Sequence, residues 1–232
     1  EELENDKQKV EETKANKEKT TEALNQAKEI KDQMAADLSE QERQLQIEIE
    51  EFVAEKNAIE EELKRIAEEE AKQNGGYTTL NPSSAGYISP IPGTTRNSIT
   101  CGFYGYSGHG GADFGGHYGE PVVAVKAGTV IKSKTTYGSI PNYDANGNYI
   151  GSYSSYGEYI IINHHDGTMT LYAHGKPGSR LVQEGETVSQ GQQIMTVGNT
   201  GNVFPRPSSS SPRNGAHLHF EVRVNGTSVN PY

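Results

Sequence analysis

An apolar residue recurs at nearly every seventh position over the first third of the chain. Two lysines interrupt this ladder, which consists of Leu3, Val10, Lys17, Leu24, Lys31, Leu38, Leu45, Phe52, Ile59 and Ile66. A seven-residue repeat keeps one face of an α-helix apolar and is typical of a coiled coil. Residues 1–74 also lack glycine and proline. They are therefore predicted to form one helix, ~110 Å long at about 1.5 Å per residue, whose apolar seam needs a partner.

The second apolar stripe of this repeat is weaker than the first. Polar residues such as Thr13, Thr20, Gln41 and Glu48 stand where apolar ones are expected, and the offset between the stripes changes from three residues to four. The change of offset indicates a slip in the repeat, and a strong permanent dimer needs two good stripes. We therefore expect a spacer or a weak homodimer seam, or a regulatory arm that exchanges partners.

Residues 75–98 break the helical pattern with several glycines, prolines and serines. This segment is predicted to be a linker, or a loop that wraps onto the next domain. From residue 99 onward, short apolar runs alternate with glycine, asparagine and aspartate, and Asn-Gly and Asp-Gly pairs signal hairpin turns. Residues 99–232 are therefore predicted to form a compact antiparallel all-β domain. The predicted fold class is α+β in sequence order, a long N-terminal helical coiled coil followed by an antiparallel-sheet domain.

The charge of the chain follows this division. The formal net charge is -10, and residues 1–73 carry 23 acidic and 12 basic side chains, whereas the rest carries 8 and 9. This balance argues against nucleic acid as a partner. No apolar run approaches the ~20 residues of a membrane span. No signal peptide is visible, and because the sequence starts at Glu1 we expect any export signal to have preceded it.

Histidines supply the candidate chemistry. All seven lie after residue 108, and three short motifs stand out: His-Gly-Gly-Ala-Asp at 109–113, Tyr-Ala-His at 172–174 and His-Leu-His-Phe-Glu at 217–221. Residues i and i+2 of a strand share a face, so His217 and His219 are expected to project side by side. Two imidazoles on one face of a sheet suit a metal, or a metal and a base. The alternative is a pair of surface histidines.

A catalytic zinc ion takes three protein ligands and leaves a fourth position for water. His109, Asp113 and one histidine of the 217/219 pair supply such a set, because the intervening glycines let the backbone turn tightly. His174 and the other histidine of the pair would then lie beside the metal, where a neutral imidazole can move a proton. The sequence has no His-Glu-x-x-His motif, which excludes the helical zinc-protease arrangement.

In their order along the chain, these motifs resemble the lysostaphin-type (LytM-like) zinc metalloendopeptidases. The stretches 185–191, 197–201 and 225–231 match as well, so the resemblance covers about residues 100–232. It implies a small antiparallel sheet whose groove holds the metal. The implied activity is hydrolysis of peptide bonds in peptidoglycan stem peptides or cross-bridges, outside the cell or in its envelope.

The resemblance also implies a role for each site residue. His109, Asp113 and His219 would bind Zn²⁺. His217 would be the general base, and His174 would steady the developing oxyanion or assist proton transfer. Among the other candidates, we expect His164 to be structural or to line the groove, His165 to be exposed, His117 to be a loop residue and Cys101 to pack rather than react.

A coiled coil ahead of such a domain also resembles EnvC-like division proteins. Some of those have lost their metal ligands and activate other wall hydrolases. All five site residues are present here, which favours an active enzyme over a non-catalytic activator or scaffold. By the same resemblance, the coiled coil is expected to dock onto a membrane or division complex, or to cover the groove. Two stretches, 137–159 and 202–216, are longer than in most relatives, and Gly175 follows His174 where leucine is common. We expect the two long stretches to shape the choice of bond.

Overall fold

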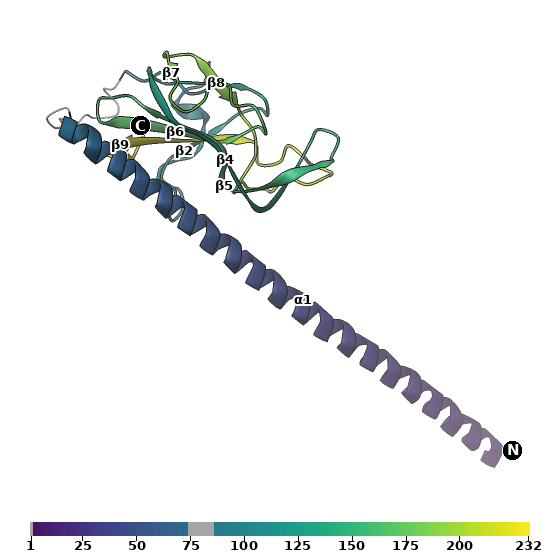
Figure 1. Ribbon diagram of the computed structural model, residues 1–232. Helices are drawn as coiled ribbons and strands as arrows, with labels where there is room; N and C mark the ends of the chain where they lie inside the picture. Colours follow the sequence, from purple (N-terminus) through teal and green to yellow (C-terminus); the bar gives the residue numbers. More distant parts are fainter. Residues whose placement is uncertain (1, 74–85) are drawn as a thin grey trace. The chain divides into compact units, whose positions relative to one another are not determined.

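The computed structural model describes residues 2–73 and 86–232 (Figure 1). In these residues, helix α1 (Glu2–Gln73) precedes a short 3-10 helix, η2 (Arg96–Ser98), and ten strands. The strands are β1 (Ile99–Cys101), β2 (Ala112–Gly115), β3 (Pro121–Val123), β4 (Gly128–Tyr143), β5 (Tyr149–Asn163), β6 (Thr168–Gly175), β7 (Thr187–Val188), β8 (Gln193–Thr196), β9 (His217–Val224) and β10 (Thr227–Val229). The predicted α+β order is confirmed, while the coiled coil stays a prediction.

The chain divides by its contacts into two compact units, Glu1–Ile49 and Glu50–Tyr232. The division falls inside α1, so the last third of the helix belongs with the β domain. The predicted boundaries 1–74, 75–98 and 99–232 stay predictions, and residues 74–85 of the predicted linker region lie outside the described residues. No helix in the described part of the chain combines the length and the hydropathy needed to cross a membrane.

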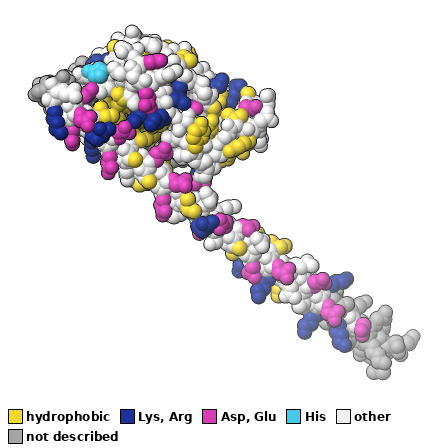
Figure 2. Space-filling view, viewed as in Figure 1, with side chains coloured by type: hydrophobic (Ala, Val, Ile, Leu, Met, Phe, Trp, Pro, Cys, Tyr) yellow, Lys and Arg dark blue, Asp and Glu magenta, His cyan; other side chains and the backbone are white. Residues whose placement is uncertain are grey.

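From Leu24 to Leu45, the apolar residues of the ladder in α1 are open to solvent. Leu24, Leu38 and Leu45 are 69%, 57% and 50% exposed. Hydrophobic side chains are visible along the helix between acidic and basic ones (Figure 2). Charged pairs within the helix, such as Arg43 with Glu40 at 2.6 Å, lie on this exposed surface. Between Lys17 and Leu45, where the structure describes the side chains of the ladder, none is buried, so the expected partner for the seam remains a prediction.

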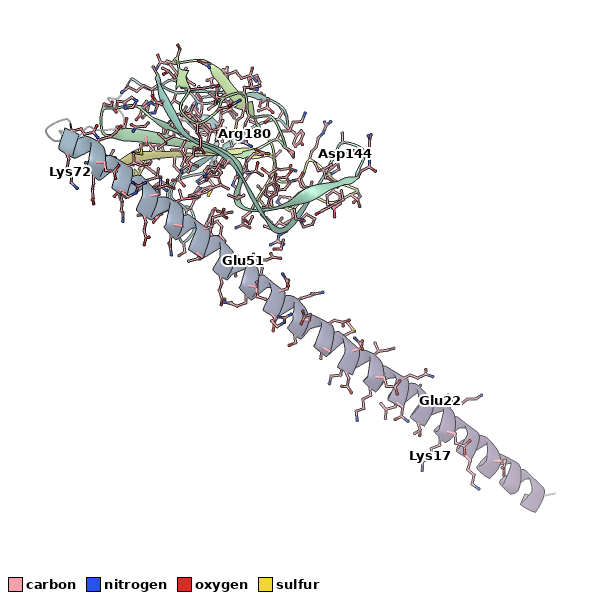
Figure 3. The ribbon with its side chains drawn as sticks, viewed as in Figure 1. Lys17, Glu22, Glu51, Lys72, Asp144 and Arg180 are labelled. Atoms are coloured by element: carbon pink, nitrogen blue, oxygen red, sulfur yellow. The ribbon has the colours of Figure 1, made fainter. Side chains whose placement is uncertain are left out.

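Downstream of residue 50, α1 packs against the sheet. Leu63 and Ala67 are buried and Ile59 and Ile66 partly so, at the three- and four-residue spacing that places them on one helix face. They contact side chains of β5 and β6, namely Tyr156, Tyr159, Ile161, Met169, Leu171 and Ala173. Burying one leucine contributes about 1.5–3 kcal/mol, so this segment is part of the core. Figure 3 labels Glu51 and Lys72 near its two ends.

The β domain consists of one large and one small antiparallel sheet. The large sheet has the strand order β1-β2-β9-β6-β5-β4-β7, with β10 paired to β9, and β3 pairs with β8 in the small one. The register places Asp113 on β2 opposite His219 on β9, and Ala173 on β6 opposite the same histidine. Three adjacent strands therefore bring the three sequence motifs together.

The Tyr-Ile-Ile-Ile stretch at 159–162 is continuously apolar because β5 is covered on both faces. Ile160 and Ile162 face the main core, which includes residues of β3 and β8. Ile161 faces the other way, into the cluster that contains Leu63 of α1. The docked end of α1 therefore acts as the second layer over the sheet.

Strands β4 and β5 continue beyond their neighbours as a long hairpin (Figure 1). Its turn is held by Asp144, labelled in Figure 3, whose Oδ1 accepts the N–H groups of Asn146 and Asn148 at 2.8 and 2.9 Å. Gly147 adopts a φ of 80°, and a Cβ there would lie 2.2 Å from the carbonyl oxygen of Ser209. The two long stretches of the sequence therefore pack against each other through a contact that only glycine allows.

Candidate metal centre

Three side-chain atoms of the predicted ligand set converge on one point. His109 Nε2 lies 3.0 Å from Asp113 Oδ1 and 3.1 Å from His219 Nδ1, and the last two atoms are 2.8 Å apart. All three residues are buried. Zinc bonds to nitrogen and oxygen of about 2.0–2.2 Å separate ligand atoms by roughly 3.4 Å. The observed triangle is therefore close to the size that one ion requires.

The hydrogen bonds on the outer side of each ring fix which nitrogen faces this point. His109 Nδ1 lies 2.8 Å from the carbonyl oxygen of Gly102, and His219 Nε2 lies 3.1 Å from Glu221 Oε1. Both oxygens accept a proton from the imidazole, which leaves a lone pair on the opposite nitrogen. Two nitrogen lone pairs and a carboxylate then face one another, and this donor set fits a metal cation.

The charges around this point also favour a bound cation. Burial would raise the pKa of Asp113, but hydrogen bonds with His109 and His219 hold it well below its usual range. Burial would lower the pKa of His219, but its bonds to Asp113 and Glu221 raise it to about 9. In the protein alone, the two carboxylates draw a proton onto this ring. A bound cation would meet the same demand for positive charge.

Cys101 forms a second potential metal group with His109 and Asp113. Its Sγ lies 3.7 Å from His109 Nδ1, the nitrogen already bonded to Gly102, whereas Asp113 is bonded to Nε2 on the other side of the ring. One imidazole cannot direct both nitrogens at the same ion. Burial, followed by the charge of Asp113, raises the pKa of the Cys101 thiol, which favours the neutral form. The histidine set is therefore the better ligand set.

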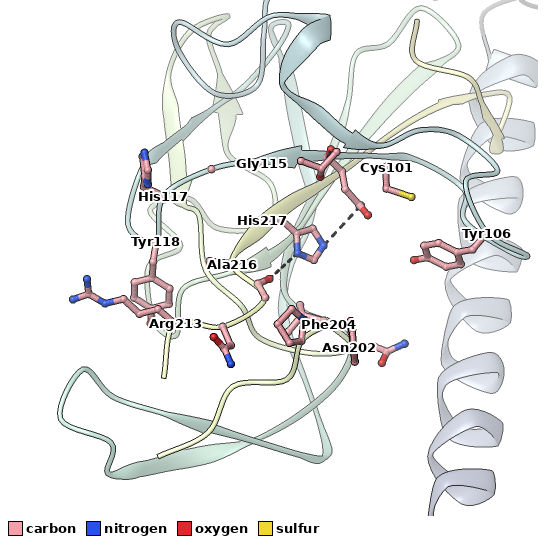
Figure 4. A pocket seen from close by; sticks show the side chains of 17 residues that line it. Cys101, Tyr106, Gly115, His117, Tyr118, Asn202, Phe204, Arg213, Ala216 and His217 are labelled. Atoms are coloured by element: carbon pink, nitrogen blue, oxygen red, sulfur yellow. Dashed lines mark hydrogen bonds and ion pairs between the residues drawn. The ribbon is translucent and has the colours of Figure 1, made fainter. Parts of the chain in front are cut away.

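His174 and His217 lie beside the triangle, with ring centroids 4.7 Å apart. His174 Nδ1 lies 2.8 Å from the carbonyl oxygen of Thr200, and His217 Nδ1 lies 2.7 Å from that of Gly215. His217 Nε2 is 3.8 Å from Asp113 Oδ1 (Figure 4, dashed line). Burial lowers the pKa of both rings, most strongly for His174, so both are neutral near pH 7. The structure thus brings together all five predicted site residues.

Backbone geometry at His174 also sets this site apart. Its φ is 63°, a left-handed conformation that is uncommon for a residue with a Cβ. Thr200 helps to hold this end of β6, because its hydroxyl donates to the carbonyl oxygen of Gly175 at 2.7 Å and accepts the N–H of Glu158 at 2.8 Å. Backbone strain that the surroundings maintain is frequent at functional sites.

A buried network behind His219 escaped the sequence analysis. Glu221 accepts hydrogen bonds from Tyr156 at 2.8 Å, from Arg223 Nε at 2.9 Å and from Ser228 at 3.1 Å, in addition to its contact with His219. These bonds hold the pKa of the Glu221 carboxyl well below its usual range although burial would raise it. The alternation 217, 219, 221 along one strand face was the available signal for Glu221. Tyr156, 65 positions away, gave none.

Two cavities meet at the centre. The larger, about 840 Å³, is lined by Asp113 and His217 and extends to Tyr118 and Arg213 (Figure 4). The smaller, about 330 Å³, is lined by His109, His174 and His219. Its opposite wall comes from four residues of α1: Phe52, Val53, Lys56 and Asn57. The Nζ of Lys56 donates to the carbonyl oxygen of Gly108, next to His109, at 2.7 Å. The docked end of α1 therefore closes one side of the centre.

The remaining histidines lie elsewhere. Both nitrogens of His164 are engaged, with the carbonyl oxygen of Ala127 and the hydroxyl of Thr170, each at 2.9 Å. His165 is exposed, and its Nδ1 lies 3.1 Å from Glu70 of α1. His117 is exposed in the loop after β2 and lines the larger cavity. None of the three takes part in the convergent set.

The segment that carries the site matches a known protein family. The model of "Peptidase family M23" matches residues 107–231. Over 124 residues, 53% of this chain, the sequence is 36% identical to the murein hydrolase activator NlpD of Escherichia coli and to the peptidoglycan DD-endopeptidase ShyC of Vibrio cholerae. The matched region spans 25% and 22% of those proteins, about a quarter of their length.

A solved M23 peptidase from Pseudomonas aeruginosa is 26% identical, with a TM-score of 0.45 over 73% of this chain and 60% of its own. The resemblance inferred from the sequence motifs is confirmed by the family match, which covers more than half of the chain. The chain belongs to peptidase family M23.

Proposed function

We propose that this protein is a zinc-dependent endopeptidase that hydrolyses peptide bonds in peptidoglycan stem peptides or cross-bridges. The observation that carries the proposal is the triangle of His109 Nε2, Asp113 Oδ1 and His219 Nδ1, whose atoms lie within 3.1 Å of one another. These residues would hold the zinc ion. A zinc ion in such a site polarises a carbonyl group and lowers the pKa of water to near 7.

His217 and His174 are proposed to handle the protons. Each ring donates its Nδ1 proton to a backbone carbonyl oxygen, so Nε2 carries the lone pair on the side of the cavities. Because burial keeps both rings neutral, His217 can take a proton from the attacking water and return it to the leaving amine. His174 Nε2 carries a lone pair as well, so it can assist by accepting the proton of the water in place of His217 and returning it to the leaving amine.

The cell envelope is the proposed location, and peptidoglycan the proposed substrate. Both follow from the family and from the names of the relatives, a murein hydrolase activator and a peptidoglycan endopeptidase. The test is mass spectrometry of fragments released by the zinc-loaded protein from purified peptidoglycans of several cross-link types. New amino termini at one defined bond are expected. An intact wall in every preparation would contradict the endopeptidase.

A second candidate is a non-catalytic activator, favoured by the likeness to NlpD. Against it, the four imidazole rings of the site are held by hydrogen bonds in orientations that suit a metal and proton transfer. An activator would release no fragments alone but would increase release by an added wall hydrolase. The His217→Ala variant of an activator would stimulate the added hydrolase as well as the unsubstituted chain does. Activity that this substitution abolishes, without any added hydrolase, would decide for the enzyme.

We further propose that α1 regulates the centre, with the stretch upstream of residue 50 available to a membrane complex, a division complex or a second copy. The docked stretch supports this because it walls the smaller cavity and contacts the residue before His109. Such regulation requires docked and released states of similar energy, because a partner can shift only an equilibrium between such states. Restraint is expected while it is docked, and release when a partner takes it.

Leu63→Ala in the full chain tests this regulation. Truncating a buried leucine weakens packing by about 2–5 kcal/mol, and Leu63 is 1% exposed. Cleavage of purified wall should become several-fold faster, with zinc content unchanged. Leu38→Ala, in the same helix but at an exposed position, should leave the rate unchanged. A slower Leu63→Ala variant with full zinc and a native circular dichroism spectrum would show that docking supports activity.

A further inference from the structure

The larger cavity has a cationic end away from the metal centre. Arg213 lines it, and its Cζ lies 5.8 Å from the centroid of the Tyr118 ring, which also lines it. The Nζ of Lys176 approaches the same ring at 5.9 Å. Figure 4 shows Tyr118 and Arg213 together, on the opposite side of His217 from Cys101 and Tyr106. A peptide in this cavity would therefore pass the metal centre and reach Arg213, while Lys176, which does not line the cavity, lies near the same tyrosine ring.

These cations are not neutralised by the protein. Among the side chains that the structure describes, no carboxylate lies within ion-pairing distance of Arg213 or Lys176. Four other cations, Lys126, Lys132, Arg180 and Arg223, each have an acidic partner. Among the described lining residues of the cavity, Asp113 is the one acid, and it belongs to the metal centre. An anionic group is the ligand that would complete this end of the cavity.

The ring of Tyr118 helps to position the guanidinium of Arg213 for such a ligand. A cation placed over an aromatic face is held by the quadrupole of the ring, so Arg213 loses less freedom when it binds. A guanidinium can give a carboxylate two parallel hydrogen bonds. Phe204, which is 90% exposed, adds an apolar surface on the same cavity for the peptide stem. The arrangement matches a carboxylate carried on a short aliphatic peptide.

We propose that Arg213, Lys176 and Tyr118 form a subsite for a free carboxylate of the peptide that this protein binds. The proposal rests on the function proposed above and makes its substrate class an anionic peptide. The carboxylate is either the C-terminal group of the peptide or a side-chain group. The loop that carries Arg213 is part of the long 202–216 stretch, so the stretch supplies selectivity.

Fluorescence anisotropy tests this subsite. The probe is fluorescein-labelled L-Ala-γ-D-Glu-L-Lys-D-Ala, used free, amidated at the glutamate carboxylate, or amidated at the C-terminus. The full chain carrying His174→Ala and loaded with zinc serves as receptor, so that turnover does not consume the probe. Amidation of one carboxylate should weaken binding about three- to tenfold, the range of a partly exposed charge-assisted contact. The position of the effective amide identifies which carboxylate is bound.

Arg213→Gln should remove this discrimination. Arg206→Gln is the matched control, since it lies in the same loop but does not line the cavity, and it should retain the discrimination. Equal affinity for the three probes, no binding of any of them, or full discrimination by Arg213→Gln would each overturn the subsite. Parallel cleavage assays on the unsubstituted chain separate the two proposals. If the protein distinguishes the probes but cleaves none of them, only the proposed endopeptidase activity is contradicted. If it cleaves all probes with equal KM, only the proposed subsite is contradicted.

Discussion

The four imidazoles of the candidate metal centre and the imidazole of His164 lie in the same β domain, and their hydrogen bonds differ. At the metal centre, His109, His174, His217 and His219 each engage an outer nitrogen with a fixed acceptor and turn the other toward the cavities. His164 engages both nitrogens, with Ala127 and Thr170. His164 is as buried as His109, His174 and His219, while His217 is partly buried. The difference therefore lies in the second nitrogen, which is available for chemistry in one place and used for stability in the other.

The sharpest test of this comparison removes the carboxylate of the triangle. Asp113→Ala should lose most of its zinc and all measurable endopeptidase activity, because two imidazoles alone leave the ion under-coordinated. Zinc per chain, measured by elemental analysis after dialysis, is the readout. His164→Gln is the comparison and should keep its zinc. Full zinc occupancy in Asp113→Ala would mean that the triangle is not the binding site.

A smaller loss is expected for the two rings proposed to move protons. His217→Ala and His174→Ala should retain zinc but lose about 10²-fold or more in turnover, the usual contribution of a general acid or base. The rate of release of peptide amino termini, compared with zinc content in the same samples, separates this effect from metal loss. Near-normal rates in both variants would show that His217 and His174 do not transfer protons in the reaction.

The structural histidine should affect pH stability rather than activity. Burial lowers the pKa of His164 to about 4, while an unfolded histidine titrates near 6.5. The unfolded state therefore binds the proton first, so the contribution of this ring is complete above about pH 6.5 and is lost as the pH falls towards 4. Between pH 7.5 and 5, this ring should account for about 2 kcal/mol of lost stability.

Guanidinium unfolding of metal-free protein at the two pH values measures this loss. In His164→Gln the change between pH 7.5 and 5 should be smaller than in the unsubstituted chain by that amount. Removing the metal keeps zinc binding out of the comparison. An identical pH dependence in the two proteins would show that folding does not lower the pKa of His164.

The smallest effect is expected at the exposed ring. His165 contacts Thr129 and Glu70 at the surface, and exposed pairs contribute about 0–1 kcal/mol. His165→Ala should change turnover by less than twofold and stability only slightly. This substitution also serves as a control for the loss of a histidine as such. A large loss of activity would show that the contact between β5 and the end of α1 matters to the site.

Sequence reasoning located the five convergent residues because local rules apply to them. The i, i+2 alternation of a strand placed His217 and His219 on one face, and glycines between residues 109 and 113 allowed the turn. The network of Glu221, Tyr156 and Arg223 depends on pairing between distant strands, which no local pattern encodes. The sequence also did not show that both ring nitrogens of His164 are engaged in hydrogen bonds.

The sequence of α1 likewise could not predict which other element packs against it. A seven-residue ladder runs through all of α1, yet Leu38 is exposed. Ile59 and Ile66, near the end of the ladder, are partly buried against β5 and β6 beside Leu63. An apolar helix face has the same period whether it packs on another helix or on a sheet. The pattern could therefore predict a seam that needs covering, but not that the β domain covers its last third.

The pairing of β2 with β9 also determines when the protein becomes capable of its chemistry. Asp113 and His219 face each other across these strands although 106 positions separate them in the chain. A chain that emerges at about 5–20 residues per second exposes the first of them roughly 5–20 s before the second. Until β9 has emerged and paired in the correct register, the triangle lacks one corner. The nascent chain therefore lacks the complete site until β9 has paired, and maturation of the site depends on assembly of the sheet.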